Sequence, residues 1–184
     1  FADKVRVQDL SAIPVPDGLD PRTAGPLMCG GITVFNPFIQ YDIKPTDKIA
    51  IFGIGGLGHM AIKFAKAWGC EVTAITGSES KIEEAKSYGA HNVVISNDID
   101  ALKKLKRSFD YIFFTGHAFK GKWSLFMNAL RPKGRLHFLG LLSEPLNISM
   151  FNLLRGQNSI SASPVGGPEA MKRMLDFCNL HSIT

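Results

Sequence analysis

The sequence predicts an α/β protein built on a doubly wound parallel sheet with helices on both faces. Strand-like and helix-like segments alternate from residue 48 to the end of the chain, which is the pattern of such a sheet. A glycine-packed turn at 53–58 joins the first of these strands to the first helix and lets the two lie close together. The segment Tyr111–Phe114 is apolar on both faces, as a central parallel strand covered by helices on both sides must be.

The beginning of the chain carries turn signals rather than a periodic apolar pattern. Residues 1–20 are predicted to be an extended connector, because prolines and an Asp-Gly pair interrupt them, and residues 21–184 are predicted to form one domain. Asp20 as a cap and Pro21 at the first helical position predict the start of a helix. We expect it to run to Phe38, with a disturbance at its central glycine pair.

The remaining elements follow from hydrophobic periodicity. Strands are expected in short β-branched and aromatic runs, at 48–53, 71–76, 92–95, 109–114, 134–140 and 159–163. Helices are expected where apolar residues recur every three or four positions, at 57–68, 80–88, 98–107, 121–130 and 168–180. Ser80 and Glu83 form a capping box, which predicts the start of the helix at 80–88.

Length and composition limit the class of protein. With 184 residues, 45% of them hydrophobic and 20% charged, the chain can form one domain with a sizeable core. No apolar run approaches the roughly 20 residues of a membrane-spanning helix. The net charge of +5 is spread over several segments without an interleaved aromatic motif, so it predicts solvated helix faces. We therefore expect neither a nucleic-acid nor a membrane partner.

Cysteine usage points to a reducing compartment. Cys29, Cys70 and Cys178 are odd in number and far apart, and no Cys-x-x-Cys pair occurs. Neither a disulfide framework nor a self-contained zinc site is expected, and the cytoplasm is the expected location. The chain begins at Phe1 without a methionine, so we expect it to be a piece of a longer protein.

The glycine-packed turn has the Gly-x-Gly-x-x-Gly spacing of a dinucleotide-binding fingerprint, between a strand and a helix as that fingerprint requires. Gly53 permits the tight turn, Gly55 lets the backbone approach a pyrophosphate, and Gly58 lets the helix pack close to the strand. Gly56 and Leu57 complete the turn, where N–H groups at the helix start make an anion site. The sequence therefore predicts a dinucleotide bound at this turn.

The end of the second strand distinguishes between dinucleotides. An NAD site carries an acidic residue there to bind the adenosine ribose, whereas this chain has Thr76. The hydroxyl of Ser78 and the ammonium of Lys81 suit the 2′-phosphate of NADP, although Glu79 adds negative charge nearby. NADP is favoured, and NAD remains the alternative. The missing acid also argues against an S-adenosylmethionine methyltransferase, and His59 stands where a nucleoside triphosphatase needs a lysine.

Several stretches together resemble one family. They are Ala24–Val34, with Pro-Leu-Met-Cys-Gly-Gly inside it, Gly53–Met60, Tyr88–Ala90, Asp110–Ile112 and Leu175–Cys178. Over nearly its whole length the chain resembles the zinc-dependent medium-chain alcohol dehydrogenases, and within them the NADP-dependent cinnamyl-alcohol-dehydrogenase-like branch. The resemblance implies a Rossmann fold, NADP as cofactor and a small alcohol or aldehyde as substrate.

The resemblance also implies roles for single residues. Cys29 corresponds to the third protein ligand of a catalytic zinc, whose first two ligands lie in an N-terminal lobe that this chain lacks. Since one thiolate cannot hold catalytic zinc, zinc is expected in the full-length protein alone, and no catalytic residue is assigned within this chain. The positions that would line the nicotinamide half are Thr33, Thr115, Gly140, Ser163 and Val165.

Three residues depart from the family pattern. Ile82 replaces a frequent basic residue, which weakens the NADP assignment. Ala162 replaces a glycine, and Pro164 removes one backbone donor from the nicotinamide segment. His117 has no role that the resemblance carries over.

The implied activity of the full-length protein is the reversible NADP-linked oxidation of a primary alcohol to an aldehyde, with zinc as Lewis acid. The chain alone is expected to bind cofactor and to catalyse nothing. Two alternatives stay open: a non-catalytic NAD(P)-binding redox-sensing module, and a zinc-free quinone reductase of the same superfamily. The family also implies a homodimer, in which the last strand, at 159–163, pairs with its mate across a two-fold axis.

Overall fold

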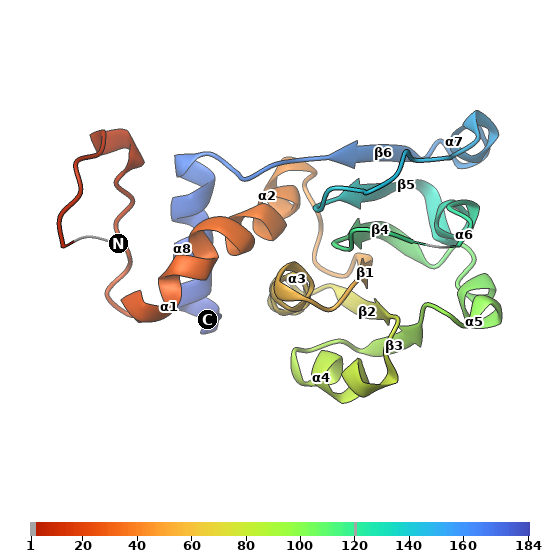
Figure 1. The fold of residues 1–184 in the computed structure, drawn as a ribbon, viewed down its shortest axis with the longest axis horizontal. Coiled ribbons are helices and arrows are strands. Elements are labelled where there is room, and N and C mark those ends of the chain that lie inside the picture. Colours follow the sequence, from red (N-terminus) through yellow and green to blue (C-terminus); the bar gives the residue numbers. More distant parts are fainter. Residues whose placement is uncertain (1–2, 120) are drawn as a thin grey trace.

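The computed structural model describes residues 3–119 and 121–184, and its centre is one six-stranded sheet (Figure 1). All its strands run parallel, in the order β3-β2-β1-β4-β5-β6. Their bounds are β1 Lys48–Phe52, β2 Glu71–Thr76, β3 Asn92–Ile95, β4 Phe109–Phe114, β5 Leu130–Phe138 and β6 Ser159–Ala162. The chain winds outward from β1 to β3, returns to β4 beside β1 and winds outward to β6. This order confirms the predicted doubly wound sheet.

Helices cover both faces of the sheet (Figure 1). Their bounds are α1 Pro21–Pro26, α2 Ile32–Gln40, α3 Gly56–Trp68, α4 Ile82–Ser87, α5 Ile99–Lys104, α6 Ser124–Ala129, α7 Met150–Gly156 and α8 Pro168–His181. Within the described ranges, no helix combines the length and the apolar composition that crossing a membrane requires. The expected connector contains a short 3₁₀ turn at Asp9–Ser11 and is largely exposed, and its residues 1–2 lie outside the described part.

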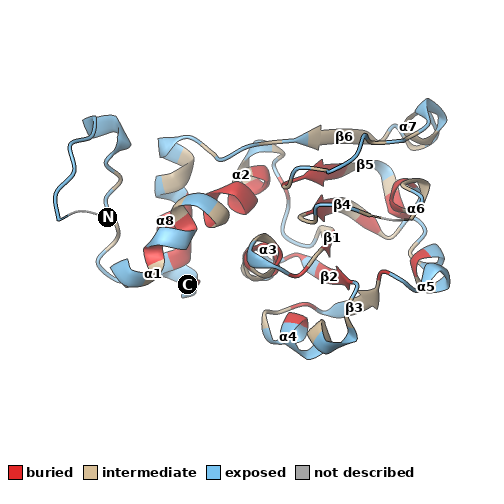
Figure 2. Cartoon of the chain, viewed as in Figure 1, coloured by how far each residue is buried: buried red, intermediate tan, exposed pale blue. Residues whose placement is uncertain are grey.

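The side chains of β1 alternate between two hydrophobic clusters. Ile49 and Ile51 belong to the cluster formed with α2, α3 and α8, whereas Ala50 and Phe52 belong to the cluster formed with α5 and α6. This division follows from the two-residue period of a strand, because successive side chains point to opposite faces. The central strands are buried on both faces (Figure 2), as predicted from the apolar run at 111–114.

The helix predicted from Asp20 is continuous but changes its winding midway. Asp20 caps it, its Oδ1 accepting a hydrogen bond of 2.9 Å from the backbone N–H two residues on. α1 passes at Leu27–Gly31 into a π-helical turn and then into α2. A Cβ on Gly31 would lie 3.1 Å from Met174 Sδ, so glycine lets this turn pack closely against α8. The disturbance expected at the glycine pair is therefore a π turn, a feature frequent at functional sites.

Two predicted boundaries in the second half of the sheet were wrong. They are the helix expected at 121–130, which is α6 at Ser124–Ala129, and the strand expected at 134–140, which is β5 at Leu130–Phe138. The cause is a bulge: Leu130 pairs with Phe109, but the next pair joins Arg135 to Tyr111, so four residues of β5 lie opposite one residue of β4. Asn158 Nδ2 holds the bulge by donating to two carbonyl oxygens within it, at 2.7 and 3.2 Å.

The helix expected at 80–88 begins later than its capping box predicts. A 3₁₀ turn occupies Glu79–Lys81, and α4 follows it. Ser80 therefore lies inside the turn instead of capping a helix, and its Oγ lies 2.7 Å from Ser78 Oγ. The Ser80 hydroxyl therefore contacts the loop that follows β2, and the capping box predicted with Glu83 does not form.

Two further differences concern short helices. The helix expected at 98–107 ends at Lys104, because the chain turns at Arg107, whose φ of 53° no right-handed helix contains. α7 was not predicted, although Ser149 caps it by accepting from the N–H of Phe151 at 3.3 Å. The other predicted strands and helices after residue 47 agree with the structure to within one residue.

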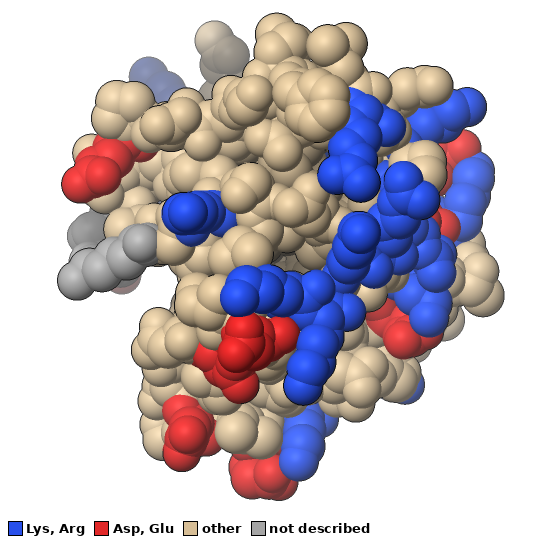
Figure 3. Space-filling model, turned by 90° about the vertical axis from the view of Figure 1, so that its right-hand side faces the viewer, with Lys and Arg blue, Asp and Glu red and all other residues tan. Residues whose placement is uncertain are grey.

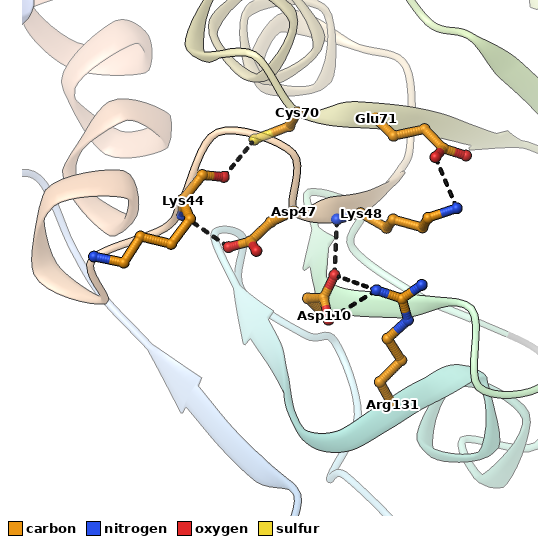
Figure 4. A network of polar contacts seen from close by, with 7 residues as sticks. All are labelled: Lys44, Asp47, Lys48, Cys70, Glu71, Asp110 and Arg131. Atoms are coloured by element: carbon orange, nitrogen blue, oxygen red, sulfur yellow. Dashed lines mark hydrogen bonds and ion pairs between the residues drawn. The ribbon is translucent and has the colours of Figure 1, made fainter.

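A polar network joins the starts of the central strands (Figure 4). Asp110 Oδ2 accepts from the backbone N–H of Lys48 at 2.8 Å and from Arg131 Nη1 at 3.0 Å. Asp47 Oδ2 accepts from the backbone N–H of Lys44 at 2.8 Å. Burial raises the pKa of Asp47, and the charge of Asp110 raises it further. The network therefore contains two carboxylates in different surroundings. Two hydrogen-bond donors stabilise Asp110, whereas burial partly removes Asp47 from water.

Opposite changes in stability are expected from these two carboxylates. Asp110→Ala removes the acceptor of two hydrogen bonds and should lower the free energy of unfolding by about 2 kcal/mol. Asp47→Asn keeps an oxygen for the N–H of Lys44 and should raise it by a few tenths of a kcal/mol at pH 7, since solvent screens this partly exposed group. The gain should vanish as pH falls through the carboxyl pKa, because the wild-type side chain then becomes neutral too. Urea denaturation at pH 7 and pH 3 measures both changes, and equal losses in the two variants would contradict this assignment.

Candidate cofactor site

The predicted fingerprint lies at the carboxyl ends of β1 and β4, where the winding of the sheet reverses. Gly53 adopts φ +91°, which a residue with a side chain rarely adopts, and its N–H donates to Ile75 O at 2.9 Å. Thr115 Oγ1 lies within hydrogen-bonding distance of Phe52 O, at 2.9 Å, and of Gly53 O, at 3.0 Å. The threonine predicted for the nicotinamide half therefore also fixes the start of the turn.

The glycines of the fingerprint turn have different surroundings. A Cβ on Gly58 would lie 1.8 Å from Gly53 O, so only glycine lets α3 approach the strand this closely. A Cβ on Gly55 or Gly56 would meet no atom within 4 Å. The space above these two residues is open, which is the space that a pyrophosphate needs.

The start of α3 faces this open space with positive charge. The first N–H groups of a helix have no partner within the helix, and α3 carries no acidic residue in its first turn. Lys81 Nζ donates to Ile54 O, so an ammonium lies beside the turn although its residue follows β2. Because helix N–H groups and the ammonium converge here, the turn fits an anionic phosphate group.

The loop after β2 presents hydroxyl groups beside Lys81. Ser78 Oγ lies 2.7 Å from Ser80 Oγ, so Ser80 lies beside the residues predicted for the 2′-phosphate. Thr76 is buried, 4% exposed, and its Oγ1 accepts from the N–H of Ser78 at 3.3 Å. Thr76 thus shapes the loop, while Ser78, Ser80 and Lys81 present the donors.

The residues predicted for the nicotinamide half come from four elements. Thr33, on α2, is buried, and its Oγ1 donates to Cys29 O at 2.8 Å. Gly140 follows β5 and lies against the loop after β4, since its Cβ would be 3.0 Å from Gly116 O. Val165 is half exposed on the segment after β6. The fold therefore brings these predicted positions to the same edge of the sheet as the fingerprint.

The residues present do not fit a catalytic zinc ion. Cys29 is a free, exposed thiol on the π-helical turn. Among the described residues, no group of three or more His, Cys, Asp or Glu side chains could hold a metal. Catalytic zinc needs about three protein ligands, so no chemical step in this chain is assigned to a metal.

Two features of this edge were missed by sequence reasoning. A cavity of about 310 Å³ lies at the ends of β1 and β3, and it is lined by Phe52, Ser96, Asn97, Ile99, Ala118, Phe119 and Gly121. The sequence signal for this cavity was the polar pair Ser96 and Asn97 directly after β3. The other feature is His137, a buried polar residue inside the otherwise apolar run of β5, and its position in that run was the signal.

The basic residues gather at the opposite end of the sheet. The sequence analysis treated them as scattered, but Lys106 and Arg155 line two neighbouring cavities. Arg107 also lines the first of these cavities, and Lys103 also lines the second. Figure 3 shows this face, where Lys and Arg predominate over Asp and Glu. The folded surface therefore has an uneven charge, and Lys81 is the basic residue seen beside the fingerprint turn in the described part of the cofactor edge.

Comparisons with known proteins agree with this geometry. A family model described as zinc-binding dehydrogenase matches residues 56–179. The aldehyde reductase AdhA of Synechocystis is 48% identical over 183 residues, which cover 100% of this chain and 54% of that protein. The chain thus spans about half the length of the curated relatives it matches.

Solved structures of similar proteins share the fold. The cinnamyl alcohol dehydrogenase SbCAD4 of Sorghum bicolor superposes with a TM-score of 0.88 at 34% identity, covering 94% of this chain and 49% of that one. CAD from Helicobacter pylori, complexed with NADP(H), has a TM-score of 0.80 at 28% identity, covering 93% and 48%. The acetophenone reductase of Geotrichum candidum, in complex with NAD, has a TM-score of 0.81 at 28% identity, covering 94% and 49%.

Proposed function

The chain belongs to the zinc-binding dehydrogenase family, and on that premise we propose that residues 21–184 are the NADP-binding domain of an alcohol or aldehyde oxidoreductase. One observation carries the proposal: Lys81 reaches the fingerprint turn from the end of β2, where an NAD site has a carboxylate. An ammonium at this point favours the dinucleotide with the additional phosphate. NAD remains the alternative cofactor, since one similar structure binds it.

The residues have separate tasks in this proposal. The N–H groups at the start of α3 would bind the pyrophosphate, and Ser78, Ser80 and Lys81 would bind the 2′-phosphate. The cavity beside Phe52 would take the adenine, because it is largely apolar and adjoins that loop. When bound, the cofactor supplies or accepts the hydride, while the chain orients it at the edge of the sheet.

The activity proposed for the whole protein is the reversible oxidation of a primary alcohol to an aldehyde. The names of its relatives, an aldehyde reductase and cinnamyl alcohol dehydrogenases, support this substrate class. Cys29 would serve as one zinc ligand where a second lobe supplies the others, with residues 1–20 as the connector to that lobe. The chain of 184 residues should therefore bind cofactor without turning over substrate.

Calorimetric titration of this chain with NADPH and with NADH tests the proposal. We expect NADPH to bind about tenfold more tightly, because a 2′-phosphate gains charge-assisted hydrogen bonds to Lys81 and the two serines. Equal affinities would remove the NADP assignment. Binding of neither dinucleotide would contradict the proposed cofactor site as a whole.

A homodimer is part of the same proposal. β6 is an edge strand of the sheet, and beside it α7 exposes Met150, Phe151 and Leu154 by 66%, 67% and 70%. A second copy pairing at β6 would cover these apolar side chains. Sedimentation should show a dimer that the double variant Phe151→Glu, Leu154→Glu converts to monomers. Leu180→Glu, at a still more exposed position on α8, is the control, and a monomeric wild-type chain would contradict the proposal.

We also propose that the protein works in the cytoplasm. Its three cysteines, all within the described residues, are free, and the thiol of Cys29 is exposed. An exposed thiol persists in a reducing compartment. Cell fractionation with an antibody to the chain tests this, and recovery from an oxidising compartment would contradict it.

A further inference from the structure

His137 lies on β5, fully buried, and both of its ring nitrogens contact serines beside the edge of the sheet. Nδ1 lies 2.8 Å from Ser161 Oγ, and Nε2 lies 3.0 Å from Ser163 Oγ. The register explains the pair, since His137 is opposite Ser161 and alternate residues of a strand share a face. Burial lowers the pKa of His137 to about 4, so the ring is neutral at pH 7, and one nitrogen donates while the other accepts.

The two serines hold different parts of the backbone. Ser161 lies within β6, whose pairing with β5 already fixes it. Ser163 follows the last residue of β6, and neither helix nor strand begins again before Pro168. The hydrogen bond to His137 Nε2 therefore fixes the first residue of a segment that the sheet no longer holds.

The same segment has a second anchor on α2. A Cβ on Gly166 would lie 3.0 Å from both Ile32 Cδ1 and Asn36 Oδ1, so the backbone there touches the helix that carries Thr33. Between the anchors, Val165 exposes 51% of its surface. The segment 163–166 is thus a short strap, tied at Ser163 and Gly166, with its exposed part beside the edge proposed for the nicotinamide.

We propose that His137 is a positioning residue for the cofactor: through Ser163 Oγ it holds the strap where its backbone contacts the nicotinamide half of NADP(H). The inference rests on the proposed cofactor site and goes beyond it, because His137 is buried and acts on that site through its hydrogen bond to Ser163. Tyr41 and Phe113 pack edge-on against the imidazole, so the ring keeps its orientation when a single serine contact is lost.

Two ligands separate the two halves of the site. NADPH carries the nicotinamide, whereas adenosine 2′,5′-bisphosphate carries the adenosine and the 2′-phosphate without it. Calorimetric titration of this chain with both gives a ratio of dissociation constants that reports the nicotinamide half. We expect Ser163→Ala to weaken NADPH binding about tenfold and to leave bisphosphate binding within about twofold of wild type, because one hydrogen bond to a buried ring is lost.

Matched variants separate positioning from general stability. Ser163→Thr keeps a hydroxyl and should retain the wild-type ratio, and His137→Phe should reproduce the effect of Ser163→Ala. Ser161→Ala removes the other hydrogen bond of the same ring and should leave the ratio unchanged, because pairing with β5 holds its backbone.

Each other outcome overturns the inference. If Ser163→Ala leaves the ratio unchanged, or weakens both ligands equally, His137 does not position the nicotinamide segment. If Ser161→Ala changes the ratio as much as Ser163→Ala does, the contacts of His137 with the two serines stabilise the strand and do not position the nicotinamide segment. A wild-type chain that binds the bisphosphate as tightly as NADPH would leave the strap without a nicotinamide to contact, yet would preserve the proposed cofactor site. Binding of neither ligand would overturn both proposals.

Discussion

Replacing Gly58 with alanine is expected to lower the free energy of unfolding by about 3 kcal/mol or more, and to abolish NADPH binding at micromolar concentrations. The added Cβ would lie 1.8 Å from Gly53 O and 2.8 Å from Gly53 C. Both are backbone atoms, so no side chain can rotate away, and α3 must move off the strand. The same Cβ would lie 3.2 Å from Thr115 Oγ1, whose hydrogen bonds hold the turn.

Two neighbouring glycines are the controls for this variant. Gly56→Ala meets no atom within 4 Å, so it should change stability by less than about 0.5 kcal/mol. Gly55→Ala should fold equally well but bind NADPH at least about tenfold more weakly, because its methyl group would occupy the space proposed for the pyrophosphate. Urea denaturation and calorimetry measure the two properties. A stable Gly58→Ala variant, or a Gly55→Ala variant with wild-type affinity, would contradict this account of the turn.

The double variant Ser78→Ala, Lys81→Ala is expected to weaken NADPH binding about 100-fold and NADH binding less than about threefold. Both side chains donate to a 2′-phosphate in the proposed site, and NADH has no phosphate there. The loss should shrink as salt is added, since part of it is electrostatic attraction to an exposed phosphate.

The structural role of Lys81 makes the comparison between the two cofactors necessary. Lys81 Nζ donates to Ile54 O, so its removal could disturb the fingerprint turn itself. Such a disturbance would weaken both cofactors alike, and that result would contradict the assignment of Lys81 to the 2′-phosphate. Lys86→Ala is the matched control, because Lys86 pairs with Glu83 on α4 and should affect neither affinity.

The parts of the fold that the sequence predicted well are those with local causes. The strands at 71–76, 92–95 and 109–114 are rich in β-branched and aromatic residues, and the fingerprint depends on glycines at most five positions apart. The bulge of β5 could not be predicted in this way. It depends on Asn158, which lies more than 20 residues from the carbonyl groups it holds.

The candidate site shows the same difference between features with local causes and features that depend on distant residues. The glycine roles at Gly53 and Gly58 follow from spacing, and the structure shows the strained φ and the close approach that those roles require. Ser80 was assigned to a helix cap because that motif is local, whereas its hydroxyl lies beside Ser78. His137 acquires its partners through strand pairing, which no single-sequence pattern specifies.

A crystal structure of this chain with NADP⁺ tests the central claim most directly. The account predicts the pyrophosphate above Gly55 and Gly56, within hydrogen-bonding distance of the N–H groups that open α3. It also predicts the 2′-phosphate in contact with Ser78 and Lys81. A dinucleotide bound away from this turn, or a 2′-phosphate directed into solvent, would contradict it.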